Sequence, residues 1–195
     1  MCMYADPGTM KTAEDSIKCY KIVYGHCDDG KVYFQSQCMN FHYELGESHA
    51  LIDQEALEGF LTPKENSYTL TILRQFEEPV SRTVRKVTLN KGFHSYKNLK
   101  DAQMCVVENT PMVLLECEIP KGACYWEGDG NLSDKDKSYY CSNALKITGW
   151  KFADDKEWRT SDYMPRCLEN RPFLLRLYSI VRNEFNARWR KNKCA

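Results

Sequence analysis

The chain has 195 residues, with 27 Lys or Arg and 27 Asp or Glu, so its formal net charge is zero. This length suits one sizeable domain, and a neutral balance gives no general electrostatic attraction to nucleic acid or to an anionic membrane. The N-terminal decapeptide has no basic segment and no apolar core, and no apolar run approaches the roughly 18 residues of a membrane span. We therefore expect a soluble, cytoplasmic protein without a membrane or nucleic-acid partner.

The first third of the chain predicts an arm, a hairpin and a helix. Residues 1–16 are polar and unpatterned, which favours a loose arm. Within residues 18–38, two strand-like runs flank the turn-forming tripeptide at 28–30, so we expect a β-hairpin there. Residues 49–61 place apolar side chains at helical intervals, with Ser48 as the expected N-cap.

The middle of the chain predicts mainly strands. Residues rich in β-branched, aromatic and other apolar side chains recur in the segments 66–76, 81–90, 112–120 and 139–152. Residues 121–138 are rich in Gly, Asp and Lys, which favours a loop. Residues 96–107 carry an apolar stripe after Ser95, which predicts a helix capped by that serine.

The order of these elements predicts an α+β fold with a twisted, mainly antiparallel sheet and flanking helices. We expect a single domain over residues 17–165 and a C-terminal helical appendage over 166–195. Within the appendage, apolar side chains recur every four residues and basic ones follow, which is typical of an amphipathic helix over 172–190: Phe173, Leu177, Val181, Phe185, Trp189, Arg188 and Arg190.

The ten cysteines predict thiols rather than disulfides, because an unexported chain lies in a reducing compartment. No Cys-x-x-Cys pair occurs, which removes the commonest structural zinc and thioredoxin-like patterns. His26, Cys27, Cys38 and His42 could converge if the first hairpin forms, but their spacing is not that of a recognised site. We therefore expect no bound metal.

The junction at residues 90–103 is the most distinctive stretch. Gly92 follows a strand and precedes a helix, which indicates a backbone position that a Cβ would obstruct. We expect Phe93 in the core and His94 at the rim of a cleft near residues 120–130, facing a ligand or partner. The competing hypothesis is that His94 only satisfies a local backbone group.

Three segments carry a resemblance to known families: GFHSYKNLKDAQMC, VLLECEIPKGACYWEG and YYCSNALKI. Their organisation resembles the ADP-ribosyltransferase-like domains, among them the poly-ADP-ribose polymerase catalytic domain, over residues 91–147. The chain also resembles small uncharacterised phage and prophage proteins, which carry Gly-Phe-His before a helix and Ile-Pro-x-Gly after a strand.

The transferase resemblance implies NAD as a ligand and a set of catalytic positions. His26 would hold the dinucleotide, Tyr96 or Ser95 would lie against the nicotinamide, and Glu116 or Glu118 would supply the carboxylate. A carboxylate stabilises an oxocarbenium-like centre electrostatically, which is the physical need of such a transfer.

Three functional hypotheses follow. The first is a phage or mobile-element accessory protein that binds and modulates a host protein in the host cytoplasm, for example a defence-system inhibitor, without cofactor or chemistry of its own. The second is the transferase-like nucleotide-binding protein or enzyme. The third is a structural protein that forms homo-oligomers through its last helix. The candidate binding residues are His94, Ser95, Tyr125, Trp126, Arg188, Trp189 and Arg190.

Overall fold

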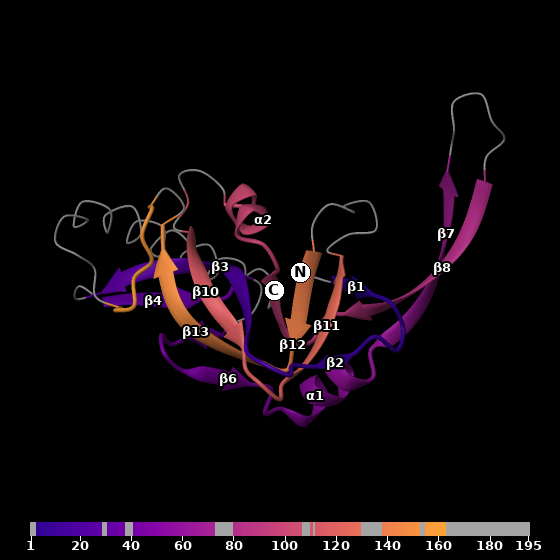
Figure 1. Ribbon diagram of the computed structural model, residues 1–195, viewed down its shortest axis with the longest axis horizontal. Coiled ribbons are helices and arrows are strands. Elements are labelled where there is room, and N and C mark those ends of the chain that lie inside the picture. The colour runs from indigo at the N-terminus through magenta and orange to yellow at the C-terminus, as the bar shows by residue number, and fades with distance from the viewer. Residues whose placement is uncertain are drawn as a thin grey trace, which may run out of the picture. The chain divides into compact units, whose positions relative to one another are not determined.

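The computed structural model describes residues 3–28, 31–37, 41–72, 80–106, 110, 112–129, 138–152 and 155–162. These residues form thirteen strands and two short helices (Figure 1). In chain order they are β1 (Met3–Ala5), β2 (Lys11–Thr12), β3 (Ile17–Asp28), β4 (Lys31–Gln35), β5 (His42–Tyr43), β6 (Ser48–Ala50), α1 (Gln54–Leu61), β7 (Lys64–Ile72), β8 (Val80–Leu89), β9 (Phe93–Tyr96), α2 (Leu99–Met104), β10 (Met112–Ile119), β11 (Cys124–Asp129), β12 (Ser138–Ser142) and β13 (Ala144–Lys151).

The fold is largely β, so the predicted α+β class with flanking helices is wrong. The two helices have only 8 and 6 residues. The helix expected over 96–107 is present but shorter, as α2, because β9 extends through Ser95 to Tyr96. The segment 121–138, expected to be a loop, contains strand β11. The expected C-terminal helix over 172–190 lies outside the described residues. None of the helices in the described part of the chain is long and apolar enough to cross a membrane.

The residues divide between two compact units. The first comprises Met1–Tyr20, Ser48–Asp101 and Cys117–Lys146, and the second comprises Lys21–Glu47, Ala102–Glu116 and Ile147–Ala195. Strands β3, β10 and β13 contribute residues to both.

In the first unit, neighbouring strands follow the order β9-β12-β11-β1-β8-β7 and pair antiparallel. Helix α1 covers one face of this sheet, where the Phe60 side chain is fully buried and the indole of Trp126 donates a hydrogen bond to the Phe60 carbonyl at 3.1 Å. Apolar side chains of the same face form the core with them: Met3, Ala5, Val87, Leu89 and Cys141.

The N-terminal segment, expected to be a loose arm, is part of this sheet. Strand β1 lies between β8 and β11, with Met3 opposite Leu89 and Ala5 opposite Gly128. Met3 and Ala5 have no exposed surface. A strand of three residues is too short to show an alternation of apolar and polar side chains, which is why the sequence pattern missed it.

The second unit contains the predicted hairpin, which is confirmed. Strands β3 and β4 pair antiparallel with Asp28 opposite Lys31. Strand β5 pairs antiparallel with β4, with Tyr43 opposite Phe34. The ring of Phe34 packs against Trp150 of β13, with 5.7 Å between the centroids. Trp150 exchanges two backbone hydrogen bonds with Arg159, which holds residues 155–162 against β13.

The strands predicted at 81–90 and 112–120 are confirmed as β8 and β10, and β7 confirms the strand predicted at 66–76 as far as Ile72, since residues 73–76 lie outside the described residues. The segment 139–152 is not one strand, because Asn143 separates β12 from β13. The Asn143 amide oxygen accepts from the backbone N–H of Cys124 at 2.9 Å, and its own N–H donates to the Cys124 carbonyl at 3.0 Å. These bonds hold Asn143 against the start of β11.

Both predicted helix caps are wrong. Helix α1 begins after Asp53, whose carboxylate accepts from the backbone N–H of Ala56 at 2.8 Å, while Ser48 lies in strand β6. Ser95 lies inside β9, four residues before Leu99, where α2 begins. Asp and Ser are both good caps, so residue preference alone did not identify the start of either helix.

Candidate functional site

A row of polar residues crosses three strands of the first unit. Ser95 of β9 lies opposite Tyr140 of β12, and Tyr140 lies opposite Glu127 of β11. Because cross-strand partners project from the same side of a sheet, these three side chains share one face. Trp126 and Cys141 alternate with them along the strands and lie on the other face, which α1 covers.

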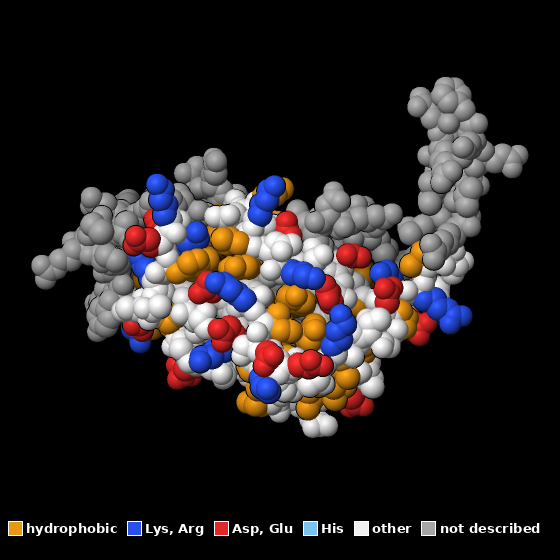
Figure 2. All heavy atoms as spheres, in the orientation of Figure 1, with side chains coloured by type: hydrophobic (Ala, Val, Ile, Leu, Met, Phe, Trp, Pro, Cys, Tyr) orange, Lys and Arg blue, Asp and Glu red, His pale blue; other side chains and the backbone are white. Residues whose placement is uncertain are grey.

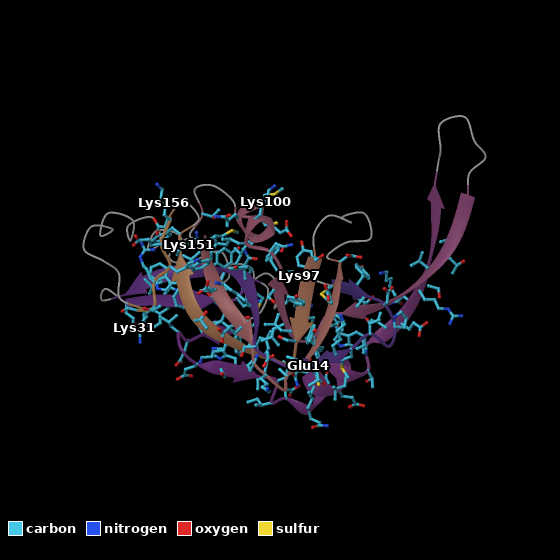
Figure 3. All side chains as sticks on the ribbon, in the orientation of Figure 1. Glu14, Lys31, Lys97, Lys100, Lys151 and Lys156 are labelled. Atoms are coloured by element: carbon cyan, nitrogen blue, oxygen red, sulfur yellow. The ribbon has the colours of Figure 1, made fainter. Side chains whose placement is uncertain are left out.

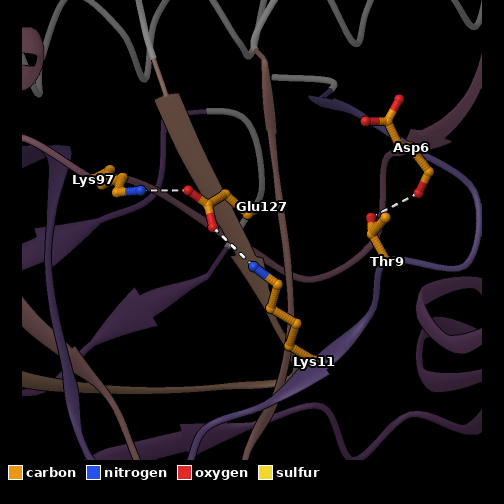
Figure 4. Close-up of polar contacts among 5 residues, drawn as sticks. All are labelled: Asp6, Thr9, Lys11, Lys97 and Glu127. Atoms are coloured by element: carbon orange, nitrogen blue, oxygen red, sulfur yellow. Dashed lines mark hydrogen bonds and ion pairs between the residues drawn. The ribbon is translucent and has the colours of Figure 1, made fainter.

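Two lysines hold the carboxylate of Glu127 from opposite sides (Figure 4). The Lys97 ammonium donates to Oε1, and the Lys11 ammonium donates to Oε2 at 3.2 Å. Lys97 is the first residue after β9, and its bond to Glu127 places its ammonium on the same face as Ser95 and Glu127. The three side chains are 32–52% exposed, so this ion-pair cluster is open to solvent.

The cluster changes the proton affinity of its members. The hydrogen bond from Lys97 lowers the pKa of Glu127, and the bond from Lys11 acts in the same direction against the effect of burial. The same hydrogen bond to Glu127 raises the pKa of Lys97. Both shifts favour the charged forms, so Lys97 is an ammonium and Glu127 a carboxylate at neutral pH.

Two tyrosines lie beside the lysines. The Lys97 ammonium lies 5.7 Å from the ring centroid of Tyr140, and the rings of Tyr140 and Tyr125 meet edge to face at 5.6 Å. Burial raises the pKa of Tyr140, and the nearby Lys97 charge opposes this increase. The phenol of Tyr140 is consequently neutral at neutral pH and able to donate a hydrogen bond.

Ser95 is the unusual member of the row. The residue is 2% exposed, and its Oγ is the one buried side-chain oxygen or nitrogen in the described part of the chain that has no hydrogen-bond partner. A buried hydroxyl without a partner costs free energy, so such a group often marks a place where an external partner binds.

The surroundings of the row are mixed in charge. Figure 2 shows lysine and acidic side chains next to one another over β11 and β12, with hydrophobic side chains between them. On the same face, the Lys86 ammonium lies 3.0 Å from Asp6 and 3.8 Å from Asp129. Tyrosine is enriched in surfaces that bind proteins, whereas lysine and acidic residues are depleted from the centre of such surfaces and suit their polar rim. We call Ser95, Lys97, Tyr125, Glu127, Tyr140 and Lys11 the tyrosine-lysine face.

The structure brings two of the predicted binding residues, Ser95 and Tyr125, into this face. Trp126 lies in the core instead, 4% exposed and bonded to the Phe60 carbonyl. The predicted residues Arg188, Trp189 and Arg190 lie outside the described residues.

At the Gly-Phe-His junction the expectations for Gly92 and Phe93 hold, whereas His94 makes the local contact of the competing hypothesis. At Gly92, where φ is +109°, a Cβ would lie 2.6 Å from the Sγ of Cys141 and 2.9 Å from the ring of Phe60. Phe93 is 6% exposed, which confirms its place in the core. The Nε2 of His94 lies 3.0 Å from the carbonyl oxygen of Leu89. The His94 side chain is therefore a hydrogen-bond partner of a nearby backbone carbonyl.

The residues implied by the transferase resemblance lie as follows. Tyr96 is 5% exposed and its ring packs 4.9 Å from that of Tyr139. Glu116 and Glu118 are half-buried on β10, where burial alternates along the strand. His26, in the second unit, stacks on Tyr33 at 5.2 Å and meets the edge of His42 at 6.4 Å.

The suggested metal ligands do not form a described site. The rings of His26 and His42 are neighbours, but Cys38 lies outside the described residues, as does the side chain of Cys27. Within the described part of the chain, no group of three or more His, Cys, Asp or Glu is placed to hold a metal ion. Five cysteines there carry thiol side chains that are not joined in disulfides: Cys19, Cys105, Cys117, Cys124 and Cys141.

A cavity of about 580 Å³ forms a second polar feature of the first unit. Its lining comes from α1 and from the strands β7 and β8, and includes Glu58, Asn66 and Thr88. At its edge the Lys91 ammonium lies 3.6 Å from Glu55. None of the residues predicted from the sequence lines this cavity.

Sequence reasoning missed Lys11, Lys97, Glu127 and Tyr140. A signal was present, because Tyr125 and Glu127 are two residues apart, as in an alternating strand, but the richness in Gly, Asp and Lys favours a loop.

Comparisons with protein-family models, with curated proteins and with solved structures find no match to the chain.

Proposed function

We propose that this protein binds another protein through the tyrosine-lysine face, without chemistry of its own. The observation that carries the proposal is the Ser95 hydroxyl, which is buried without a partner next to Tyr140 and the Lys97-Glu127-Lys11 cluster. Because the hydroxyl is buried in the unbound protein, a partner group reaches it only when a neighbouring side chain of the face moves aside, and the new hydrogen bond would then remove its energetic cost. The role is the one expected for an accessory protein that modulates a host protein.

The chemistry of the face favours a partner with an acidic side chain. Each ammonium group has three donors and gives one of them to Glu127. Lys97 and Lys11 therefore keep donors for a further carboxylate, whose charge would balance the second lysine. Tyr125 and Tyr140 supply large, rigid contact area at low entropic cost, which is why tyrosine is frequent in binding hot spots.

The transferase-like alternative receives no specific support from the geometry. Tyr96, one of the residues that would lie against nicotinamide, is occupied by its contact with Tyr139. Its neighbour Ser95 is buried, and it lies on the side of the sheet that carries Lys97, Tyr140 and Glu127. A titration with NAD separates the two functions, because the binding proposal expects no saturable NAD binding.

Variants of one lysine test the binding proposal. The substitution Lys97→Ser removes an ammonium of the face, and Lys100→Ser removes an exposed ammonium on α2 in the same unit, as a matched control. Lys97 lies in the connection between β9 and α2, and Figure 3 shows it beside β12, at a separate position from Lys100 on α2. Each variant serves as bait in a quantitative affinity purification from a candidate host lysate, with photo-crosslinking from residue 125.

We expect a specific partner to crosslink at position 125 and to be lost with the Lys97→Ser bait but retained with the Lys100→Ser bait. Purified partner and bait should then bind directly, with an affinity that falls about tenfold or more on loss of a desolvated charge contact. Equal recovery of every protein by the two baits would contradict the proposal, provided that both variants unfold at the same denaturant concentration.

A further inference from the structure

Strand β7 is the last strand of its sheet in the described part of the chain. It pairs with β8 in nine consecutive register positions, from Lys64 opposite Thr88 to Ile72 opposite Val80. No described residue pairs with its other edge. A regular strand of this length offers a row of backbone donors and acceptors to another strand.

The outer part of this hairpin is a two-stranded ribbon. Strand β1 pairs only with Val87, Thr88 and Leu89 of β8, so the pairs from Asn66 opposite Lys86 to Ile72 opposite Val80 have no third described strand beside them. In Figure 1 the hairpin extends away from β1 and α1 of the same unit. Two-stranded ribbons are marginally stable in water, whereas three or more strands support one another.

The edge of β7 lacks the features that usually prevent pairing. Natural edge strands are protected by charges, proline, bulges or very short length. In β7 the charges are confined to Lys64 and Glu65, residues 66–72 are uncharged and contain neither proline nor glycine, and the register against β8 has no bulge. Ser67 and Thr69 are exposed.

We propose that β7 is a dimerisation edge, on which a second copy of this chain places its own β7 antiparallel about a two-fold axis at Tyr68. This register pairs all nine residues of each strand and joins two hairpins into one four-stranded sheet. It places Lys64 opposite Ile72 of the other copy and Glu65 opposite Thr71, so no like charges meet. A parallel, in-register pairing would instead place Lys64 opposite Lys64. The interface is independent of the tyrosine-lysine face.

The proposed register can be tested by charge pairs, because it places Ser67 opposite Thr69 of the other copy, twice per dimer. The variant S67E/T69E brings two carboxylates together at both positions. The variant S67E/T69K brings a carboxylate and an ammonium together instead. Both variants carry the glutamate introduced at position 67, which faces Arg85 of the same chain. An effect of this glutamate on the folding of the single chain is therefore common to the two variants.

Sedimentation velocity over a range of concentrations measures the dimer. We expect the unmodified chain and S67E/T69K to dimerise, and S67E/T69E to dissociate with a Kd at least about tenfold higher than that of S67E/T69K. A chain that stays monomeric at its highest soluble concentration overturns the proposal. Equal dimerisation of both variants also overturns it, because the dimer is then held elsewhere, for example by the C-terminal segment. Occupation of the β7 edge by an unrelated protein would overturn it as well.

Discussion

Gly128 of β11 lies against the backbone of Tyr4 so closely that a Cβ built on it would come within 2.0 Å of the Tyr4 carbonyl oxygen. The same Cβ would lie 3.0 Å from the Cα of Ala5. The absence of a side chain at this position is therefore what allows β1 to lie between β11 and β8. The N-terminal segment depends on a residue more than a hundred positions away in the sequence.

The substitution Gly128→Ala should consequently destabilise the first unit. The methyl group meets backbone atoms that cannot rotate away, so β1 must shift, and overpacking of this kind costs about 1–3 kcal/mol. Urea unfolding measures the loss. Gly59→Ala on α1 is the control: its Cβ would meet only the flexible Lys91 side chain at 3.2 Å, and alanine favours a helix by up to about 1 kcal/mol. If both variants had equal stability, the tight approach at Gly128 would be disproved.

Two buried serines on the same face should respond in opposite directions to alanine. Ser95 has an unpartnered Oγ, whereas the Oγ of Ser142 donates to the Ala144 carbonyl at 2.7 Å. Ser95→Ala should stabilise the isolated protein by about 1 kcal/mol, and Ser142→Ala should destabilise it by a similar amount. Denaturant midpoints decide between the signs. Loss of stability in Ser95→Ala would mean that the hydroxyl is already satisfied, and the proposed binding function would lose its main support.

The hydrogen bond from Lys97 gives Glu127 a pH signature. A carboxyl whose pKa is lower in the folded than in the unfolded chain stabilises the fold above its ordinary value of 4.5, and this contribution disappears as pH falls through the lower folded value. We expect unfolding measurements to show wild type more stable than Glu127→Gln at neutral pH, with the difference shrinking below pH 4.5. A difference that stays constant down to strongly acidic pH would exclude the ion pairs as its source.

Local patterns predicted those elements that are defined by neighbouring residues. The hairpin at β3 and β4 follows from strand-forming runs around a short turn, and β10 follows from a continuous apolar segment. The fold class failed because strands such as β1, β9 and β11 are short and take their stability from partners distant in the sequence. Strand propensity reflects this tertiary context, so single-sequence patterns carry little of it.

The candidate site was only partly predictable for the same reason. Ser95 and Tyr125 were named individually, but Lys11, Lys97 and Glu127 come from three separate segments. Their proximity depends on the register of β11 with β12 and β2, which no local pattern specifies. The sequence drew attention to the Gly-Phe-His junction, whereas the unpartnered hydroxyl belongs to Ser95, the residue that follows His94.

The last prediction concerns His94 itself. The carbonyl of Leu89 can only accept, so the Nε2 of His94 carries the proton and donates across the connection between β8 and β9. His94→Ala should therefore cost about 1 kcal/mol of stability, as for a lost hydrogen bond. His94 and Ser95 project to opposite faces of β9, so affinity for a partner bound at the tyrosine-lysine face should not change once folding is complete. His94→Gln, which offers an amide donor of similar reach, should recover part of the stability. Unfolding midpoints and binding titrations of both variants measure these effects, and a variant that keeps its stability while losing affinity would place His94 in contact with the partner.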